Sequence, residues 1–507
     1  MQKGNRIFYP IIGLIVIIGF LFRSSYIEER PVHADEAENS YLLGGALAGE
    51  NYHFDPTHHH GPTLHYYLRV VTLFTGANSF RSLEIEPLRI GICVLGCLTL
   101  LGVAAFARYV GWVAIVASAI LGVVSSYLTY YGNYVIHETL LGVFGIAWIL
   151  VFWSNLKNPS AFKLASMGII TALLVATKLT AAILFLSWGL SILINKNLFR
   201  EGWHSFLIKG SRWRGSLIVC FGFLTVFSLL YSDFFRNPTG VWDAVRTFWS
   251  YETQVGHEKP WFYYLSEFFL PFQSRPVWSH ETGLLGFALF GGFWSMVRLL
   301  KKPIEKQDKG LSLGYFLVSS SVVQIVVYSV ISYKSPWVLL VTWLQLLILA
   351  GLGFQSLWNS RGNWGKAGLA LVFALLLFVQ VRSTQYWNGT LHSHDQNPLA
   401  YVPTSKNVSN LASFLEGTFG DERIRVVGEY LWPLPWYLRR LPKVEYDEAL
   451  QSIDDGDIFL LTDDSYEELP KKEVYVFLPY SLRPNFPIYL AVTQEKWSAI
   501  NAKLNDR

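Results

Sequence analysis

The sequence predicts an α-helical polytopic membrane protein that carries a small α/β domain outside the membrane. Its 507 residues are 52% hydrophobic and 15% charged, whereas a soluble domain carries about 25% charged residues. Long uncharged stretches, such as 90–107 and 139–156, match the roughly 20 apolar residues that cross a bilayer. The chain after residue 383 differs, because charges and prolines return there.

Apolar windows place about eleven candidate spans along the chain. The pair near 163–177 and 179–194 is short and split by Lys178, so it fits either two tilted spans or one broken hairpin. The first window is expected to be a retained span, because no small-residue cleavage site follows closely. The windows lie near 7–23, 88–107, 110–127, 136–153, 163–177, 179–194, 216–232, 283–298, 312–332, 336–356 and 366–382.

Basic residues set the expected orientation. They gather in the loops 195–214, 298–309 and 361–366. Counting spans puts these loops on the side of the N-terminus, which the positive-inside rule makes cytoplasmic. We therefore expect an integral protein of the plasma (inner) membrane with a cytoplasmic N-terminus. The segment 24–87 and the chain after 383 would then lie on the outer face.

Two domains are expected, a transmembrane module over 1–382 and an extracytoplasmic domain over 383–507. The aromatic segment 261–272 is expected at the headgroup level, where Trp and Tyr are favoured. In the second domain, short alternating runs predict strands and two stretches predict helices. The predicted strands lie near 423–427, 457–461, 474–478 and 488–492, and the predicted helices near 408–415 and 446–453.

Composition and motifs exclude several classes of function. The formal net charge of +4 is small for this length, and a nucleic-acid binder would show a clustered basic face. The three cysteines all lie inside apolar runs, which does not fit a disulfide framework. The sequence contains no Walker loop, no GxSxG elbow and no CxxC pair.

An acidic pair directly follows the first span, inside the first outer loop 24–87. Asp35 and Glu36 could supply a general base or hold a divalent metal ion. The alternative is structural, with Asp35 as a helix N-cap and Glu38 completing a capping box. Both roles remain open, since a cap would also fix the carboxylate of Asp35 in place.

A second acid, Glu138, begins the fourth span on the same predicted side, after a tyrosine-rich stretch over 127–134. An ionisable residue at the edge of a span is a functional candidate. Alternatively, the helix dipole favours an acid in the first turn. Glu138 and Asp35 come from distant segments yet share a face, which favours a functional role.

Histidines on the outer side could bind a metal ion. Three consecutive histidines, at 58–60, cannot easily all face one ion, and a plain polar loop is the alternative. We expect that one of them contributes, and that histidines of the long loop 233–282 could complete the site. The candidate ligands are His60, His137, Glu138, His257 and His280.

Cations on the outer side could bind a phosphate leaving group, because charge-assisted hydrogen bonds to phosphate are strong. They could instead be interfacial anchors whose charged ends reach the headgroups. Within the spans, Gln324 and Gln345 are the main strongly polar groups, whereas a coupled transporter places its polar site near the midplane. Ionisable groups at the rim fit an enzyme that works on a lipid headgroup. The candidate cations are Lys178, Arg275, Lys334 and Arg382.

These residues resemble the motifs of the GT-C glycosyltransferases, a superfamily that includes protein O-mannosyltransferases and aminoarabinose transferases. The sequence looks most like a prokaryotic branch found near N-glycosylation genes and named as flippase-activity-associated. Two positions depart from its pattern, since Leu179 stands where a glutamate is expected and no basic residue lies near Asn133. The matching motifs are 33–36 (HADE), 60–63 (HGPT), 136–138 (IHE), 333–337 (YKSPW), 397–401 (NPLAY) and 432–439 (WPLPWYLR).

The resemblance implies a GT-C fold and a hexosyl or pentosyl transferase that uses a polyprenyl-phosphate sugar as donor. It implies Asp35 as general base for an acceptor hydroxyl, with inversion at the anomeric carbon. Glu36, Glu138 and a divalent cation would organise the site. Lys178 and Lys334, with Arg275 and Arg382, would bind the donor phosphate.

The acceptor stays open among protein, lipid and glycan, and an envelope glycosylation complex is a candidate partner. Two other functions remain as alternatives. The chain could be a flippase for lipid-linked oligosaccharides, or a non-catalytic accessory or scaffold for such a system.

Overall fold

The computed structural model describes residues 5–57, 60–195, 212–250, 258–269, 281–301, 309–450 and 458–505. Internal contacts divide the chain into two compact units. The membrane unit comprises residues 1–27, 51–71 and 86–391, and the sheet unit comprises 28–50, 72–85 and 392–507. The predicted boundary at 382 assigns the whole first outer loop to the membrane module, whereas the contacts assign two pieces of it to the sheet unit.

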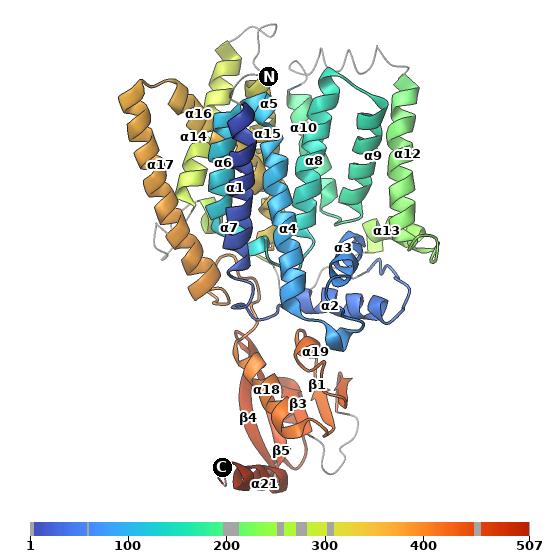
Figure 1. Ribbon diagram of the computed structural model, residues 1–507. Helices are drawn as coiled ribbons and strands as arrows, with labels where there is room; N and C mark the ends of the chain where they lie inside the picture. The colour runs from blue at the N-terminus through green and yellow to red at the C-terminus, as the bar shows by residue number, and fades with distance from the viewer. Residues whose placement is uncertain are drawn as a thin grey trace. The chain divides into compact units, whose positions relative to one another are not determined.

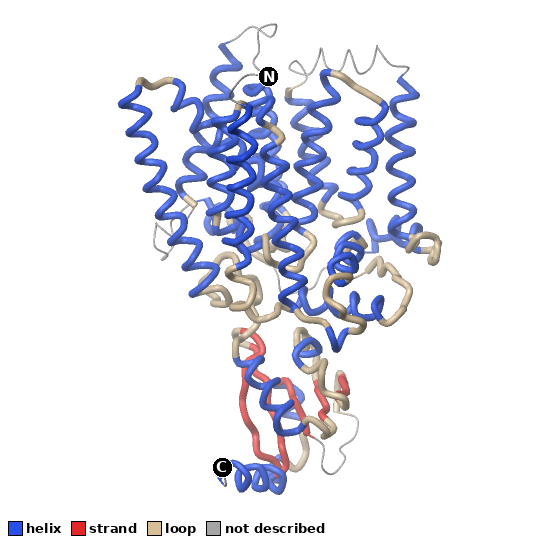
Figure 2. Tube along the Cα trace, in the orientation of Figure 1, coloured by secondary structure: helices blue, strands red, loops and turns tan. Residues whose placement is uncertain are grey.

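The membrane unit is built of α-helices in its described part (Figure 1, Figure 2). Short turns join some of them: η2 (Leu265–Phe269), η5 (Pro336–Leu339) and η6 (Gln385–Thr390). The helices are α1 (Asn5–Ser24), α3 (Thr63–Thr72), α4 (Ile85–Ala104), α5 (Ala107–Val110), α6 (Trp112–Val124), α7 (Ser126–Tyr131), α8 (Glu138–Lys157), α9 (Ala161–Val175), α10 (Ala181–Ile194), α12 (Arg212–Tyr231), α13 (Gly240–Ser250), α14 (Thr282–Lys301), α15 (Lys309–Val330), α16 (Leu340–Asn359) and α17 (Asn363–Thr384).

Each of the eleven predicted windows coincides with an apolar helix in the described part of the chain. Three of these helices are shorter than a full span, namely Trp112–Val124, Ala161–Val175 and Ala181–Ile194. The polytopic helical fold is therefore confirmed, while the number of eleven crossings stays a prediction. By length and composition, eight helical stretches among the described residues could cross a membrane: Ile7–Ser24, Ile85–Val110, Glu138–Leu156, Trp213–Tyr231, Thr282–Leu299, Gly310–Val330, Pro336–Asn359 and Asn363–Thr390.

Glycines let neighbouring helices pack backbone to backbone. A Cβ atom at Gly291 of α14 would lie 2.0 Å from the carbonyl oxygen of Leu349 in α16. In the same way, a Cβ at Gly168 of α9 would lie 2.1 Å from the carbonyl oxygen of Val219 in α12. Because a bilayer gives helices no hydrophobic reason to associate, such close contacts hold a membrane bundle together.

The polar groups inside the spans bind one another. Gln324 donates to the hydroxyl of Ser187 at 3.0 Å and accepts from Thr342 at 2.7 Å and from Gln345 at 3.2 Å. All four side chains are buried, and they join α10, α15 and α16. Buried amides need such partners, so this network explains the two glutamines as internal links between helices.

The sheet unit contains a five-stranded sheet in the order β2-β1-β3-β5-β4. Strands β2, β1 and β3 are parallel, and β5 and β4 pair antiparallel. Helices accompany the sheet: α2 (Ala34–Leu47), η1 (Phe80–Ser82), α18 (Asn407–Phe419), α19 (Leu434–Tyr437), α20 (Asp463–Glu468), η7 (Lys472–Val474) and α21 (Gln494–Asn505). The strands are β1 (Ile424–Val427), β2 (Val444–Asp447), β3 (Ile458–Thr462), β4 (Tyr475–Arg483) and β5 (Phe486–Thr493).

Four of these strands and α18 are where the sequence predicts them, but the predicted helix over 446–453 is wrong. Tyr446 and Asp447 belong to β2, and residues 451–453 lie outside the described residues. Pairing with β1 explains the strand, because Arg425 binds Asp447 at 2.7 Å across the two strands. Cross-strand pairs of opposite charge stabilise a sheet, and a local pattern cannot show them.

Candidate active site

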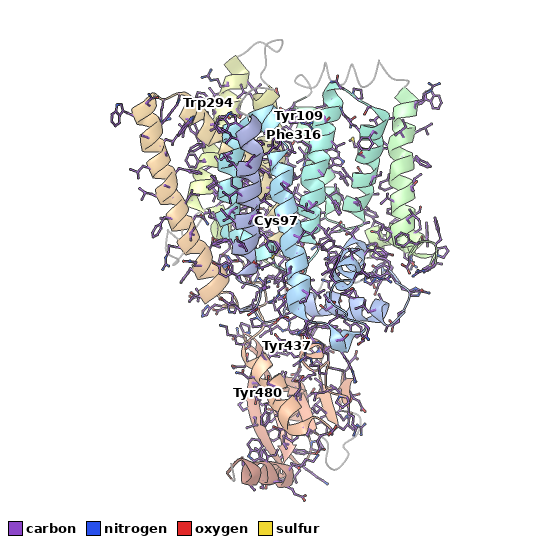
Figure 3. The ribbon with its side chains drawn as sticks, in the orientation of Figure 1. Cys97, Tyr109, Trp294, Phe316, Tyr437 and Tyr480 are labelled. Carbon is purple, nitrogen blue, oxygen red and sulfur yellow. The ribbon has the colours of Figure 1, made fainter. Side chains whose placement is uncertain are left out.

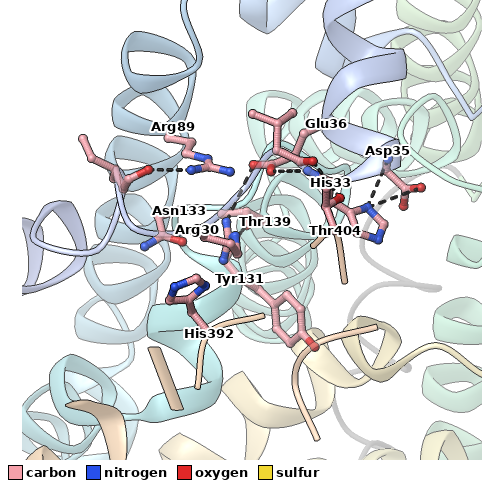
Figure 4. A network of polar contacts seen from close by, with 12 residues as sticks. Arg30, His33, Asp35, Glu36, Arg89, Tyr131, Asn133, Thr139, His392 and Thr404 are labelled. Carbon is pink, nitrogen blue, oxygen red and sulfur yellow. Dashed lines mark hydrogen bonds and ion pairs between the residues drawn. The ribbon is translucent and has the colours of Figure 1, made fainter. Parts of the chain in front are cut away.

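The acidic motif lies at the start of α2, and His33 caps this helix (Figure 4). The amide of Asp35 donates to His33 Nδ1 at 3.1 Å, and the amide of His33 donates to Glu36 Oε2 at 3.2 Å. This reciprocal pattern is a capping box with histidine as the capping residue. The expected box of Asp35 and Glu38 is therefore wrong, because the box begins two residues earlier.

The two carboxylates of the motif have different surroundings. Glu36 is fully buried, and its Oε1 lies 3.6 Å from Arg30 Nη2. The side chain of Asp35 keeps 43% of its surface exposed, with Oδ1 at 3.8 Å from His33 Nδ1. Buried charges are normally paired with opposite charges, so Glu36 and Arg30 support the fold locally. Asp35 is the carboxylate that a reactant can reach.

Three of the six matching motifs belong to the sheet unit, namely 33–36, 397–401 and 432–439. They contact each other there. His33 Nε2 lies 2.8 Å from the carbonyl oxygen of Tyr401, and the hydroxyl of Tyr437 accepts from the amide of Val32 at 2.8 Å. The segment that precedes Asp35 is thus bound by residues that follow it by more than 360 positions.

In the membrane unit, the structure brings Glu138 and Lys178 together. The Lys178 ammonium donates to Glu138 Oε1, and the two side chains are 10% and 2% exposed, respectively. Glu138 is the first residue of α8, and Lys178 lies in the turn between α9 and α10. The two charges, predicted as separate functional groups, form one buried ion pair.

The motif at 60–63 contacts the neighbours of this pair in the fold. The ring of His60 contacts that of His137, with centroids 5.1 Å apart. The amide of Thr63 donates to the carbonyl oxygen of Ala176 at 3.1 Å, and a Cβ at Gly61 would lie 2.1 Å from that oxygen. The motif therefore joins the start of α8 to the turn that carries Lys178.

The turn over 333–337 carries the other candidate lysine of the membrane unit. Lys334 is 1% exposed and donates to the carbonyl oxygen of Ile331, and its burial lowers the pKa of its ammonium. Tyrosines support the turn, since Tyr264 donates to Ser335 O at 3.0 Å and Tyr127 to Pro336 O at 2.7 Å. The tyrosine-rich stretch over 127–134 thus has a structural role beside this turn.

The remaining candidates divide into two groups. Arg382 is exposed and donates to Gln385 at 3.0 Å, as expected of an interfacial anchor. Arg275, His257 and His280 lie outside the described residues.

Where the structure describes the chain, no group of three or more His, Cys, Asp or Glu side chains could hold a metal ion. The described candidates therefore do not fit a metal centre, although His60 and His137 touch.

Among the described residues of the membrane unit, Glu281 is a buried acid that sequence reasoning missed. Glu281 directly precedes α14 and accepts from the Ser125 hydroxyl at 2.8 Å, the Tyr127 amide at 2.7 Å and the Trp343 indole at 2.9 Å. It links the first turns of α7, α14 and α16. Its position at the edge of a span, like that of Glu138, is the signal that could have identified it.

No family model and no curated protein matches the sequence. The structure, however, is similar to ArnT from Cupriavidus metallidurans bound to undecaprenyl phosphate, with a TM-score of 0.62 and 14% identity over 98% of this chain and 99% of that one. It is also similar to the Archaeoglobus fulgidus oligosaccharyltransferase in complex with Zn and sulfate, with a TM-score of 0.57 and 13% identity over 96% of this chain and 73% of that one.

Both of these proteins are GT-C glycosyltransferases. The chain therefore has a GT-C fold over nearly its whole length, and the resemblance stated from the motifs is confirmed at the level of the fold. The assignment to the flippase-activity-associated branch stays a prediction.

Proposed function

We propose that this protein is a glycosyltransferase that moves a sugar from a polyprenyl-phosphate donor to an acceptor hydroxyl. The observation that carries the proposal is the exposed carboxylate of Asp35 at the capped start of α2, beside the buried Glu36. The GT-C fold supports it, as does the undecaprenyl phosphate bound to ArnT in the similar structure. The experiment below distinguishes a hexose donor from a pentose donor.

In this mechanism Asp35 acts as the general base. Its carboxylate takes the proton of the acceptor hydroxyl while that oxygen bonds to the anomeric carbon, and the bond from this carbon to the phosphate oxygen breaks. Polyprenyl phosphate leaves with both electrons of that bond. A single displacement inverts the configuration and passes through an oxocarbenium-like transition state. The capping box fixes the backbone of Asp35, which keeps the base in a defined place.

The proposed partners of the departing phosphate are Lys178 and Lys334. An ammonium has three donors, so Lys178 can keep its bond to Glu138 and still donate to a phosphate oxygen. Donors that are already in place stabilise developing negative charge without reorganisation. We assign Glu138 the role of orienting Lys178. Roles for Arg275 and Arg382 at the phosphate stay predictions, as does a divalent metal ion.

The alternatives are a lipid-linked oligosaccharide flippase and a non-catalytic scaffold. A transport site is expected near the midplane, and there the buried amides of Gln324 and Gln345 already bind each other. This favours the enzyme over the flippase. Partners in an envelope glycosylation complex are compatible with either the enzyme or the scaffold.

The test uses purified protein in nanodiscs with a panel of radiolabelled polyprenyl-phosphate hexoses and pentoses. Release of polyprenyl phosphate and formation of glycosylated product are measured for the wild type and for Asp35→Asn. Because Asn cannot accept the proton, we expect at least a 100-fold loss of transfer, in line with the contribution of general bases. Exposed Asp421 of the same unit provides the control Asp421→Asn, which should behave as the wild type.

Each result decides between the candidates. Transfer that depends on Asp35 supports the enzyme and identifies the donor sugar. Transfer that survives in Asp35→Asn would remove the general-base role. Movement of the lipid across a bilayer without a new glycosidic bond would support the flippase instead.

A further inference from the structure

The two residues before the catalytic helix are bound by the far end of the sequence. The amide of Val32 donates to the hydroxyl of Tyr437 at 2.8 Å, and the carbonyl oxygen of Val32 accepts from the hydroxyl of Thr404 at 2.8 Å. His33 Nε2 lies 2.8 Å from the carbonyl oxygen of Tyr401. All five residues belong to the sheet unit, and Thr404 and His33 are among those labelled in Figure 4.

These contacts use both nitrogens of the His33 ring. Nδ1 accepts from the amide of Asp35 and so carries no proton, while Nε2 faces the carbonyl oxygen of Tyr401 and must donate. The imidazole is therefore held at both nitrogens, one at Tyr401 and the other at the first turn of α2. In this way it connects the region around 401 directly to the backbone of Asp35.

The middle of α2 is also held by the same region. Its Tyr41 ring packs on Trp432 with centroids 5.9 Å apart, and Phe80 of η1 packs on Trp436 at 6.0 Å. Arg439 donates from Nη2 to the carbonyl oxygen of Leu83 at 2.8 Å, just after η1. Helix α2 is thus fixed at its start through Val32 and His33 and along its length through η1 and Trp432.

We propose that the segment 401–439 of the sheet unit positions Asp35 for catalysis, and that Tyr437, Thr404 and His33 are positioning residues. This inference rests on the proposed function. A base that is misplaced by about 1 Å can lose about 100-fold in rate, so the contacts that hold Val32 and His33 act on the reaction through Asp35. The sheet unit then has a part in the chemistry itself.

The first test removes one hydroxyl at a time. Tyr437→Phe deletes the acceptor of the Val32 amide and keeps the ring, and Thr404→Val deletes the donor to the Val32 carbonyl. The loss of one hydrogen bond predicts a decrease in kcat of about threefold to tenfold, with an unchanged KM for the donor. Tyr489→Phe is the matched control, because it deletes a hydroxyl bond to Asp463 in the same unit, away from α2.

Two substitutions at His33 separate its two contacts. In His33→Asn, the side-chain oxygen can replace Nδ1 as the helix cap. In His33→Gln, the side-chain amide can replace Nε2 as the donor to Tyr401. We expect each of these two variants to have a lower kcat of sugar transfer than the wild type, and His33→Ala to have a lower kcat than either. Equal loss in all three would contradict a role for the two separate contacts.

Hydrogen exchange tests the contacts of Val32 and His33 without relying on sugar transfer. Hydrogen exchange, followed by mass spectrometry of peptides that cover 30–40, reports the Val32 and Asp35 amides directly. Tyr437→Phe should speed exchange there, and Tyr489→Phe should not. Faster exchange with an unchanged kcat would overturn the positioning role, whereas a wild type that transfers no sugar would overturn the proposed function itself.

A merely structural effect is excluded by a double variant. In the Asp35→Glu background the carboxylate is already displaced. Adding Tyr437→Phe should therefore lower kcat by a smaller factor there than it does in the wild type. An equal decrease in kcat in both backgrounds would show that Tyr437→Phe lowers the fraction of folded protein rather than acting through Asp35. That result would overturn the inference.

Discussion

Glu138 and Lys178 form a charge pair with a structural role that is separable from the role we propose for it at the donor phosphate. Each group is buried in the membrane unit and neutralised by the other. A buried pair contributes little net stability, but removing one partner leaves an uncompensated charge that costs about 3–5 kcal/mol. The pair therefore predicts stability effects that are separable from any effect on phosphate binding.

We expect Lys178→Met and Glu138→Gln each to lower thermal stability, by about 3 kcal/mol. The double variant should recover much of this loss, because no unpaired charge remains. Thermal unfolding followed by intrinsic fluorescence measures both effects, with exposed Lys259→Met as the control. If the double variant is stable yet transfers no sugar, Lys178 has the proposed role at the phosphate. Single variants as stable as the wild type would contradict the buried pair.

We expect His65 of α3 to make the stability of the protein sensitive to acid. Its ring is 7% exposed, and burial, followed by the positive charge of Arg69, lowers its pKa from 6.5 to about 4. The unfolded chain takes up a proton near pH 6.5 and the folded chain only near pH 4, so stability falls as the pH falls through this window.

The expected loss between pH 7 and pH 4 is about 3 kcal/mol for this one group. Thermal unfolding measured at intervals from pH 7 to pH 4 should show a shallower decline in His65→Gln than in the wild type. His53 is exposed, and His53→Gln should keep the wild-type profile. An unchanged slope in His65→Gln would show that other groups cause the acid sensitivity.

At the scale of the element, helix α2 depends on a close contact with η1. A Cβ at Gly44 would lie 2.5 Å from the Cβ and 2.7 Å from the Cα of Phe80. A Cβ at the neighbouring Gly45 would instead meet the carboxylate of Glu50 at 2.4 Å, and that side chain is exposed and can turn away. Two adjacent glycines thus offer a matched comparison.

We expect Gly44→Ala to destabilise the sheet unit by about 1–3 kcal/mol, the usual cost of overpacking, and to lower transfer by displacing α2. Gly45→Ala should be neutral or stabilising by up to about 1 kcal/mol, since Ala favours helix. Hydrogen exchange of peptides over 34–47 and sugar transfer measure the two effects. If Gly45→Ala lowered stability and sugar transfer more than Gly44→Ala, the packing of α2 on η1 would be disproved.

The elements also show what a sequence can predict. Apolar windows locate the helices of the membrane unit, because hydropathy is a local property. The capping box was misplaced because His33 is not one of the usual capping residues. Strand β2 was missed because its pairing with β1 is not local. The partnership of Glu138 with Lys178 could not be predicted either, since 40 residues separate them.

At the scale of the whole molecule, the six matching motifs divide evenly between the two units. The sheet unit holds 33–36, 397–401 and 432–439, and the membrane unit holds 60–63, 136–138 and 333–337. Within each unit, the contacts described above join the motifs to candidate functional residues. The sequence could predict the motifs but not their partners, because the contacts between them cross hundreds of positions.

Basic–aromatic pairs support the predicted orientation of the membrane unit. Tyr109 and Trp294, stacked under Arg108 and Arg298 at 4.9 Å and 4.4 Å, lie at the same end of the bundle (Figure 3). The start of α1 lies at that end as well (Figure 1). Aromatic and basic side chains together are typical of a membrane interface, and basic residues favour the cytoplasmic one.

Reporter fusions test this orientation. Alkaline phosphatase, which is active only outside the cytoplasm, should be active when fused after residue 507 and inactive when inserted in the turn between α16 and α17, near Arg361. A green fluorescent protein at the same two positions should give the opposite pattern. An inactive phosphatase after residue 507 together with an active one at the turn would reverse the predicted topology.

The hydrogen bond between Val32 and Tyr437 spans 405 positions, and this separation has a consequence for biosynthesis. At the usual 5–20 residues per second, a ribosome needs about 20–80 seconds to travel from one residue to the other. During most of that interval the nascent chain already contains Asp35 but not yet the segment 401–439 that holds the residues before it. On the proposed function, a growing chain should therefore transfer sugar from the lipid-linked donor more slowly, and full activity begins only once the last quarter of the protein has been made and folded.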